Sequence, residues 1–529
     1  MEKNLTKQFI STTETLRTKM DASEYKNYIL GLIVYKYLSD KLLLEVVEQS
    51  GEELTDYSTK DKQTTLYKKL LEDNEIKEDL LQELLNELSY VIEPNYLFNV
   101  LAEQARTETL KLDDLREALI NISNSNPFFF GLFDDVDLSS RKLGNDEEQQ
   151  LLIISDILIK LNEIDMMNHD IKSIGLAFDS LIDKFSLDSG KRVEDFFTPI
   201  SISGILARIV TMGHTNKQEF SIYDPVMGSG SLLLKVGNSI HPSTRVKYYG
   251  QELNATTFNL ARMNFIMHGI DMKQAVLNNG DTLNKDWPIT EPKTFDSVVM
   301  NPPYSAKWSA DKSFLSDSRF SEFDKLAPKS KADFAFLLHG LYHLKDNGTM
   351  AIILPHGVLF RGAAEGDIRK KLLEDGNIEA VIGMPSNLFY GTSIPTTIIV
   401  LKKNRLEKDV LFIDASREFE KEKLQNKLTK ENVDKIIDTY REKKIIDRYS
   451  YIASFDEIKG NDYNLNIPRY VDTFEEVAPL DIKAVSNELK EINAKKQELN
   501  QKMSAMIHSL DDRYLVDSNV KAIIELLNK

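Results

Sequence analysis

A glycine-rich turn with an acidic residue at its start is the first feature of this sequence that could bind a ligand. An apolar run ends at Asp224, the segment Pro-Val-Met-Gly-Ser-Gly follows, and an apolar helix is expected to begin near Ser231. Gly228 and Gly230 permit a tight turn and a close approach of the backbone to a ligand. Leu233 takes the third glycine position of a dinucleotide-binding motif, so the turn is not that motif. The pattern suits a ligand site and an ordinary strand–turn–helix connection about equally.

Two further acidic residues follow predicted strands. Glu252 closes the run Tyr-Tyr-Gly-Gln-Glu, and a carboxylate in this position can accept hydrogen bonds from both hydroxyls of a ribose. Asp281 follows a plausible third strand and could accept a hydrogen bond from the exocyclic amine of an adenine. An ordinary turn aspartate explains Asp281 nearly as well.

The segment Asn-Pro-Pro-Tyr, residues 301–304, directly follows the apolar run Ser-Val-Val-Met. Two prolines remove two backbone donors and stiffen the chain, so that the neighbouring carbonyls face outward as acceptors. Asn301 adds an amide oxygen and Tyr304 adds an aromatic face. Together they predict a site for a planar base that carries an exocyclic amine.

Composition excludes several other kinds of chemistry. The 529 residues include no cysteine, which rules out disulfides, thiolate metal sites and a cysteine nucleophile. The eight histidines show no ligand spacing, so no metal site is expected. No apolar stretch approaches the ~20 residues that span a bilayer, and we expect a cytoplasmic protein with no membrane partner. A net charge of −17 argues against unaided, non-specific binding to a polyanion.

Short β-rich runs alternate with helical stretches between about residues 167 and 405. Such alternation predicts an α/β domain with a mostly parallel sheet and helices on both faces. Ligands bind outside the carboxyl ends of the strands in these sheets, so the three motifs are expected at one edge. The clearest strand candidates span 220–224, 246–251, 295–300, 349–354, 378–382 and 396–401.

Both ends of the chain have helical periodicity. Before about residue 165, runs such as 42–47 and 80–88 repeat apolar positions at three and four residues, with a break near Pro127. After about residue 472, apolar residues recur in alternating steps of three and four, which is typical of a coiled coil, and only Lys496 interrupts them. A narrow apolar stripe of this length needs a partner helix; the chain's own domains or a second copy are the alternatives. The stripe consists of Ile482, Val485, Leu489, Ile492, Leu499, Met503, Met506 and Leu510.

The order of the motifs resembles that of the amino-methyltransferases that use S-adenosylmethionine to methylate adenine N6 in DNA. Asp195-Phe-Phe-Thr-Pro199 resembles the F-x-T-P segment of these enzymes, whose aromatic residue packs on the cofactor. Because this segment precedes the glycine-rich turn and Asn-Pro-Pro-Tyr comes last, the order resembles the gamma class. One departure is Ile200, where the family often has a basic residue, so that flank is not expected to contact the cofactor.

Segments near the two ends of the chain resemble one particular group of these methyltransferases. Residues 16–26 and 32–40 look like the helical N-terminal domain of the modification (M) subunit of type I restriction-modification systems. Residues 461–470 look like the closing segment of that subunit.

The resemblance implies a Rossmann-like S-adenosylmethionine-dependent methyltransferase domain over residues 166–471. An N-terminal helical domain, residues 1–165, and a C-terminal helical segment for subunit assembly, residues 472–529, flank it. The implied substrate is adenine in double-stranded DNA. The implied partners are a DNA-specificity (S) subunit, bound by two M subunits, and a restriction (R) subunit.

The resemblance also assigns roles to individual residues. It implies that the cofactor S-adenosyl-L-methionine is bound by Asp195, Phe196, Phe197, Thr198, Pro199, Asp224, Gly228, Ser229, Gly230, Ser231, Glu252 and Asp281. It implies that the catalytic residues, which contact the target amine, are Asn301, Pro302, Pro303 and Tyr304. The target base must leave the duplex to react, and Tyr304 is expected to stack on it. The loop 305–331 carries Lys307, Lys312, Arg319, Lys325, Lys329 and Lys331 and could meet phosphates; a solvated loop is an equal alternative.

Four other functions are alternatives to adenine N6 methylation. Cytosine C5 methylation is excluded because it needs a cysteine nucleophile. Cytosine N4 methylation stays open, although enzymes of that type more often carry Ser before the two prolines. Enzymes that methylate a glutamine amide share Asn-Pro-Pro-Tyr but are shorter. A catalytically inactive scaffold of a DNA-binding complex is the remaining alternative, and cofactor binding would distinguish it.

Overall fold

The computed structural model describes residues 2–13, 22–188, 198–214, 217–389, 392–423, 425–473, 481–509 and 522. The chain divides into two compact units, residues 1–472 and 473–529, which are described separately. No helix among the described residues is long and apolar enough to cross a membrane.

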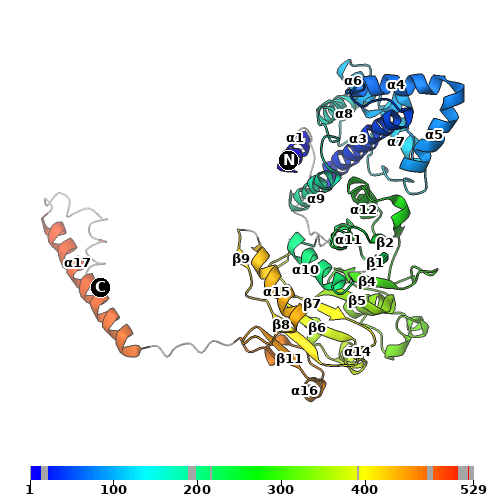
Figure 1. Ribbon diagram of the computed structural model, residues 1–529. Coiled ribbons are helices and arrows are strands. Elements are labelled where there is room, and N and C mark those ends of the chain that lie inside the picture. The colour runs from blue at the N-terminus through cyan, green and yellow to red at the C-terminus, as the bar shows by residue number, and fades with distance from the viewer. Residues whose placement is uncertain are drawn as a thin grey trace. The chain divides into compact units, whose positions relative to one another are not determined.

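Helices make up the N-terminal part of the first unit, as the periodicity predicts (Figure 1). Their apolar side chains share one core, in which Tyr35, Phe98 and Phe178 are fully buried. The predicted break near Pro127 is confirmed, because residues 124–146 contain no helix or strand. The helices are α1 (Glu2–Thr12), α3 (Ala22–Ser50), α4 (Lys60–Glu72), α5 (Asn74–Leu88), α6 (Phe98–Arg106), α7 (Leu112–Ser123), α8 (Glu147–Asn162) and α9 (Ile171–Asp188).

A nine-stranded mixed sheet forms the rest of the unit, in the order β11-β8-β6-β7-β5-β4-β1-β2-β3. The strands from β3 to β5 are all parallel, whereas β7 is antiparallel to both of its neighbours. All six strand candidates are confirmed, and β8 and β11 are additional. The strands are β1 (Glu219–Asp224), β2 (Arg245–Glu252), β3 (Ala275–Asn279), β4 (Phe295–Met300), β5 (Leu344–Pro355), β6 (Ile378–Gly383), β7 (Thr396–Leu401), β8 (Val410–Asp414) and β11 (Ser450–Ala453), with a separate hairpin of β9 (Glu420–Lys421) and β10 (Asn426–Lys427).

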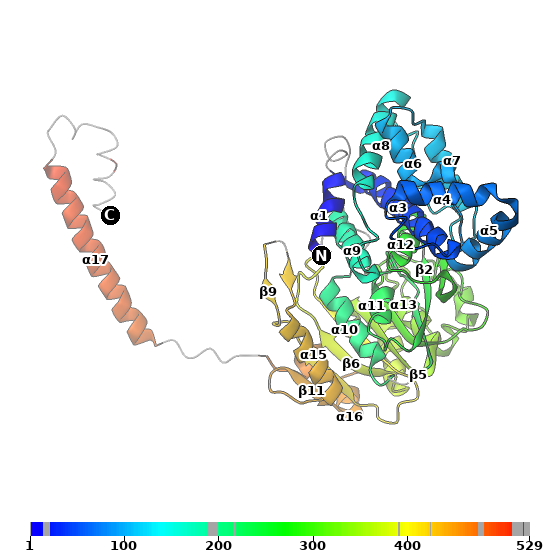
Figure 2. The same cartoon turned by 45° about the horizontal axis from the view of Figure 1, so that its top comes forward.

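Helices cover both faces of the sheet because successive strand residues point to opposite sides. In β4, for example, Val298 faces one apolar cluster and Val299 faces the other. Figure 2 shows α10 and α15 packed together on one face. That face carries α10 (Ile200–Thr211), α11 (Ser231–Gly237) and α15 (Lys430–Glu442), and the other carries α13 (Asp333–Tyr342), α14 (Ala363–Glu374) and α16 (Phe455–Gly460).

One helix, α12 (Ala255–Met267), joins the N-terminal helices to the sheet. Ala261 and Phe265 belong to the core against the sheet, whereas Met263, Ile266 and Met267 belong to the core of the N-terminal helices. A helix that is apolar on all sides is stable only when it is buried in this way. Ala255, Thr257 and Leu260 of α12 also line a cavity.

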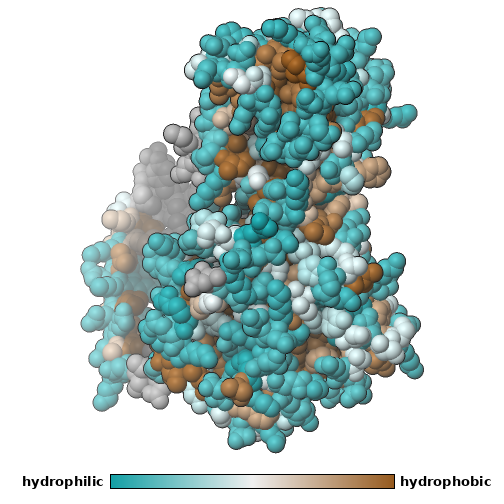
Figure 3. Space-filling model, turned by 45° about the vertical axis from the view of Figure 1, so that its right-hand side comes forward, coloured by the Kyte–Doolittle hydropathy of each residue, from teal (hydrophilic) through white to brown (hydrophobic). Residues whose placement is uncertain are grey.

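The second unit contains α17 (Ile482–His508). None of its described side chains is buried, and the apolar residues at the predicted three- and four-residue spacing are exposed. Leu510, the last residue of the predicted stripe, lies outside the described residues. By contrast, the face of the molecule in Figure 3 is dominated by hydrophilic residues with small, separate hydrophobic patches.

Candidate functional site

A cavity of about 630 Å³ lies at the carboxyl ends of β1 to β4. The strand order reverses between β1 and β4, and such a switch point is where doubly wound sheets bind ligands. A volume of this size suits a small molecule of nucleoside dimensions. The predicted site residues in its lining are Thr198, Asp224, Gly228, Ser229, Ser231, Glu252, Asp281, Asn301 and Pro303.

Residues of the glycine-rich turn line this cavity. Gly228 has a φ of 54°, and no atom lies within 4 Å of the place where a Cβ would be, so a side chain there would enter open space. Gly230 has a φ of 76°, and a Cβ would lie 2.7 Å from the ring of Phe265. Both positions therefore need glycine, the first for a ligand to approach and the second for α11 to pack on α12.

Asp224 is a buried carboxyl at the end of β1. Its Oδ1 accepts a hydrogen bond from the backbone N–H of Val226 at 2.9 Å, and no ion pair among the described residues involves it. Burial raises the pKa of Asp224 to about 8. A cationic ligand would supply the missing partner and favour the ionised form.

Glu252 and Asp281 reach the same cavity from the ends of β2 and β3. The backbone N–H groups of Gly228 and Asn254 donate to the two oxygens of Glu252 at 3.1 and 2.8 Å, so its carboxylate also fixes the glycine-rich turn. Asp281 is exposed, and its Oδ1 accepts from the N–H of Leu283 at 3.0 Å. A carboxylate has about four lone-pair sites, so both residues keep acceptor capacity for ligand hydroxyl or amine groups.

Asn301 is held from both sides of its amide. Its Nδ2 donates to Oγ1 of Thr198 at 3.1 Å, and the hydroxyl of Tyr304 donates to its Oδ1 at 2.9 Å. Burial holds the pKa of Tyr304 well above its usual range, so the hydroxyl keeps its proton. The ring of Tyr304 meets Phe389 edge to face, with centroids 6.0 Å apart. The contact between Thr198 and Asn301 brings together the F-x-T-P segment and Asn-Pro-Pro-Tyr, which lie about a hundred residues apart in the sequence.

Four of the predicted site residues that the structure describes are not in the lining of the cavity. Pro199 caps α10, Gly230 packs inward, Pro302 is buried and Tyr304 is half-buried behind Asn301. Asp195, Phe196 and Phe197 lie outside the described residues. Several lining residues were not anticipated from the sequence, among them Lys26, Ile182 and Ser186. Phe336 of α13 also lines the cavity.

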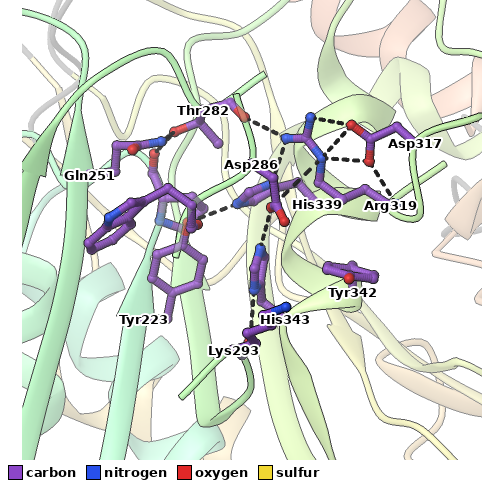
Figure 4. Close-up of polar contacts among 12 residues, drawn as sticks. Tyr223, Gln251, Thr282, Asp286, Lys293, Asp317, Arg319, His339, Tyr342 and His343 are labelled. Atoms are coloured by element: carbon purple, nitrogen blue, oxygen red, sulfur yellow. Dashed lines mark hydrogen bonds and ion pairs between the residues drawn. The ribbon is translucent and has the colours of Figure 1, made fainter. Parts of the chain in front are cut away.

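The loop after Asn-Pro-Pro-Tyr is anchored at both ends. The N–H of Ser305 donates to Oδ1 of the buried Asp333 at 2.9 Å, and Arg361 pairs with Oδ2 of Asp333 at 3.1 Å. Further along the loop, the guanidinium of Arg319 is buried and donates to the carbonyl of Thr282 at 2.7 Å (Figure 4). The expectation that Arg319 could meet a DNA phosphate is therefore wrong. Lys307, Lys312, Lys325 and Lys329 are exposed.

Two histidines at the end of α13 lie with Asp286, and the possible ligand atoms of all three are within 4.8 Å of one another. Contrary to the expectation that the histidines show no ligand spacing, His339 and His343 are four residues apart. In Figure 4 each ring is already bonded within the protein. His339 contacts the hydroxyl of Tyr223 at 2.8 Å through Nε2, and His343 contacts Asp286 at 2.8 Å through Nε2 and the carbonyl of Lys293 at 2.6 Å through Nδ1.

The cation in this cluster is Arg319. Its Nη1 lies 3.2 Å from Nδ1 of His339, and its Nε lies 3.8 Å from Asp286. Burial, with the charges of His343 and Arg319, holds the pKa of His339 well below its usual range. A metal ion here would meet the guanidinium at close range. The cluster instead joins the loop to Thr282, which lines the cavity.

The doubly wound sheet, the cavity at its switch point and the amide beside that cavity define a methyltransferase that acts on an amine. The chain belongs to the N-6 DNA methylase family, whose model matches residues 169–478, and to the methylase subunits of type I restriction enzymes within it. A second family model, the HsdM N-terminal domain, matches residues 5–158.

Individual relatives cover nearly the whole chain. It is 36% identical to the MpnII methylase subunit of a type I restriction enzyme from Mycoplasma pneumoniae, over 95% of this chain and 96% of that protein. It is 30% identical to the MjaVIII methylase subunit from Methanocaldococcus jannaschii, over 91% of this chain and 80% of that one. The crystal structure of the methyltransferase subunit of a type I restriction-modification system from Streptococcus thermophilus is 50% identical, with a TM-score of 0.87, over 90% of this chain and 100% of that one.

Proposed function

We propose that the chain transfers the methyl group of S-adenosylmethionine to N6 of an adenine in double-stranded DNA. The observation that carries the proposal is the position of Asn301, whose amide lies at the carboxyl end of β4, lines the cavity and is fixed by Thr198 and Tyr304. The family membership supports the same reaction.

The cavity suits S-adenosylmethionine by the chemistry of its lining. Asp224 is a buried carboxylate that has no cationic partner among the described ion pairs, and the cofactor carries both a sulfonium and an ammonium group. Glu252 and Asp281 offer acceptors for the ribose hydroxyls and the adenine amine, and Gly228 leaves open space beside them. When bound, the cofactor supplies an electrophilic methyl group.

The protein's own contribution is to the target amine. The N6 lone pair of adenine is delocalised into the ring, so the amine is a poor nucleophile. Oδ1 of Asn301 and the backbone carbonyl of Pro302 each accept a hydrogen bond from one N6–H group, which draws the nitrogen toward tetrahedral geometry. As the bond from N6 to the methyl group replaces the bond from sulfur to that group, N6 loses one proton to solvent. Each acceptor contributes a few kcal/mol to the transition state. Holding the reacting atoms in line contributes about 7–11 kcal/mol more.

The target adenine reaches this site by leaving the duplex. Tyr304 and Phe336 provide aromatic surface for the extruded base, which is worth ~1–3 kcal/mol per stacked ring. The exposed lysines of loop 305–331 are assigned to the backbone phosphates, because this loop directly follows Asn-Pro-Pro-Tyr in the chain and its arginine, Arg319, is buried.

The proposed assembly is that of a type I modification subunit in the cytoplasm, with two copies bound to one DNA-specificity subunit and a restriction subunit in the full complex. The exposed apolar stripe of α17 supports a helical partner. A chain with net charge −17 also needs another subunit to hold and read DNA at physiological salt.

Mass spectrometry of DNA from cells that produce this chain with its specificity subunit tests the reaction. N6-methyladenine is expected at one sequence, and N4-methylcytosine alone would contradict the proposal. Asn301→Ala should remove methylation while the affinity for the cofactor stays nearly unchanged. Gly228→Val should instead lower that affinity, because its side chain would fill the cavity and its φ of 54° disfavours a branched residue.

A further inference from the structure

Lys26 is the one lysine or arginine among the described residues that line the cavity. It lies on α3, in the N-terminal helical part, whereas every other described lining residue comes from position 182 onward. Its side chain is half-buried, and no ion pair to a described acidic residue is formed.

The start of α3 is fixed against α9 by aromatic packing. Tyr25 is buried, and its ring meets Phe185 edge to face, with centroids 5.4 Å apart. The next residue on each helix, Lys26 and Ser186, lines the cavity. The backbone position of Lys26 is therefore set by the packing of α3 on α9.

The charges of the cavity are unequal. Asp224, Glu252 and Asp281 are acidic, and Lys26 is the one cation among the lining residues that the structure describes. The acidic residues suit the sulfonium, ammonium and hydroxyl groups of S-adenosylmethionine, but they repel its carboxylate. The carboxylate is the one anionic group of this cofactor, and a hydrogen bond from a cationic donor binds it more strongly than one from a neutral donor.

We propose that Lys26 binds the carboxylate of the methionine moiety of S-adenosylmethionine. The inference rests on the proposed function, since it assumes this cofactor. The cofactor is then held by both parts of the first unit, with the acidic side chains on the sheet and the ammonium of Lys26 on the N-terminal helices. Binding of the cofactor consequently stabilises the contact of α3 and α9 with the sheet.

Calorimetry on the full-length chain with two ligands tests this assignment. One ligand is S-adenosylmethionine, and the other is decarboxylated S-adenosylmethionine, which keeps the sulfonium and the ammonium but lacks the carboxylate. Lys26→Met should weaken binding of the first ligand by on the order of tenfold to a hundredfold, because a hydrogen-bonded charge pair is lost. Binding of the decarboxylated ligand should stay unchanged.

Two control variants accompany the measurement. Lys26→Arg keeps the charge and should retain most of the affinity. Lys41→Met removes an exposed lysine of the same helix outside the cavity and should leave both affinities unchanged. Equal losses for both ligands in Lys26→Met, or no loss for either, would overturn the assignment while leaving the proposed function standing. A wild-type chain that binds neither ligand would overturn the proposed function, and this inference with it.

Discussion

At the scale of single residues, the structure gives Tyr304 a role that differs from stacking alone. Its hydroxyl donates to Oδ1 of Asn301, the oxygen assigned to the target amine. Tyr304→Phe keeps the ring and removes this bond, so the amide loses one of the two contacts that orient it. We expect kcat to fall by about tenfold, since a single hydrogen bond contributes ~0.5–1.5 kcal/mol. The dissociation constant of the cofactor should not change.

Steady-state kinetics with hemimethylated and unmethylated duplexes can measure this effect. Thr198→Val is the matched variant, because it removes the contact on the other side of the same amide. If Tyr304→Phe were as inactive as Asn301→Ala, the hydroxyl would have a larger role than orienting the amide.

Asp224 makes cofactor binding depend on pH. Its pKa is about 8 in the ligand-free protein because the carboxyl is buried, and a cationic ligand binds the ionised form. The protonated form predominates below that pKa, so affinity should fall as pH decreases from 8 to 6, by at most about tenfold per pH unit. Calorimetry over this range measures the slope. Asp224→Asn cannot ionise and should bind more weakly with a flatter profile; an unchanged slope would assign the dependence to another group.

At the scale of elements, the loop 305–331 depends on one buried arginine. Arg319 bonds to Asp317 through Nη2 at 2.7 Å, to the carbonyl of Thr282 and to His339. Arg319→Met removes the partner of Asp317, of the Thr282 carbonyl and of His339 Nδ1. We expect the free energy of unfolding to fall by about 3 kcal/mol. Thermal unfolding measures the loss. Lys312→Met, at an exposed position of the same loop, should change stability by less than about 0.5 kcal/mol.

The same pair of variants separates an interior arginine from one that binds DNA. A phosphate-binding Arg319 would leave the melting temperature unchanged and weaken DNA binding. Stable Arg319→Met protein with poor DNA affinity would therefore contradict the burial-based role.

Strands were predictable where apolar, β-branched runs are bounded by polar turns, as in 295–300 and 396–401. β8 and β11 escaped because they lie after residue 405, where the predicted alternation of strands and helices ends, and a four-residue run such as β11 does not separate strand from helix by periodicity. The loop 305–331 shows the other limit. Its six basic residues look alike in the sequence, and only tertiary packing decides that Arg319 turns inward while Lys312 stays in solvent.

At the scale of the whole molecule, some residues of the candidate cofactor site could be predicted from the sequence and others could not. Asp224, Glu252 and Asn301 were predictable because each follows a strand, and parallel strands bring their carboxyl ends together. Lys26 was not, because no local pattern shows where the N-terminal helices pack on a distant domain. The burial of α12 on two sides decides that placement. A motif that lies within one domain can thus be read from spacing, whereas a residue supplied by another domain cannot.

The exposed apolar stripe of α17 bears on whether the chain needs a partner subunit. α17 exposes its apolar stripe along its length; Ile482 is 79% exposed and Met506 is 71% exposed. An isolated helix is marginal in water, and each apolar side chain contributes about 1.5–3 kcal/mol when a partner buries it. Truncation after Leu480 should therefore leave cofactor binding intact but abolish co-purification with the specificity subunit and methylation at its site.

A pair of point variants gives the same test without removing the helix. Leu489→Asp places a charge in the stripe, whereas Asn487→Asp places the same charge outside it. Only the first should prevent assembly, because a buried unpaired carboxylate is costly and a solvent-exposed one is not. Light scattering on the chain alone supplies the competing outcome. A dimer that Leu489→Asp dissociates would mean that the stripe binds a second copy of this chain, and normal methylation by the truncated protein would exclude both partners.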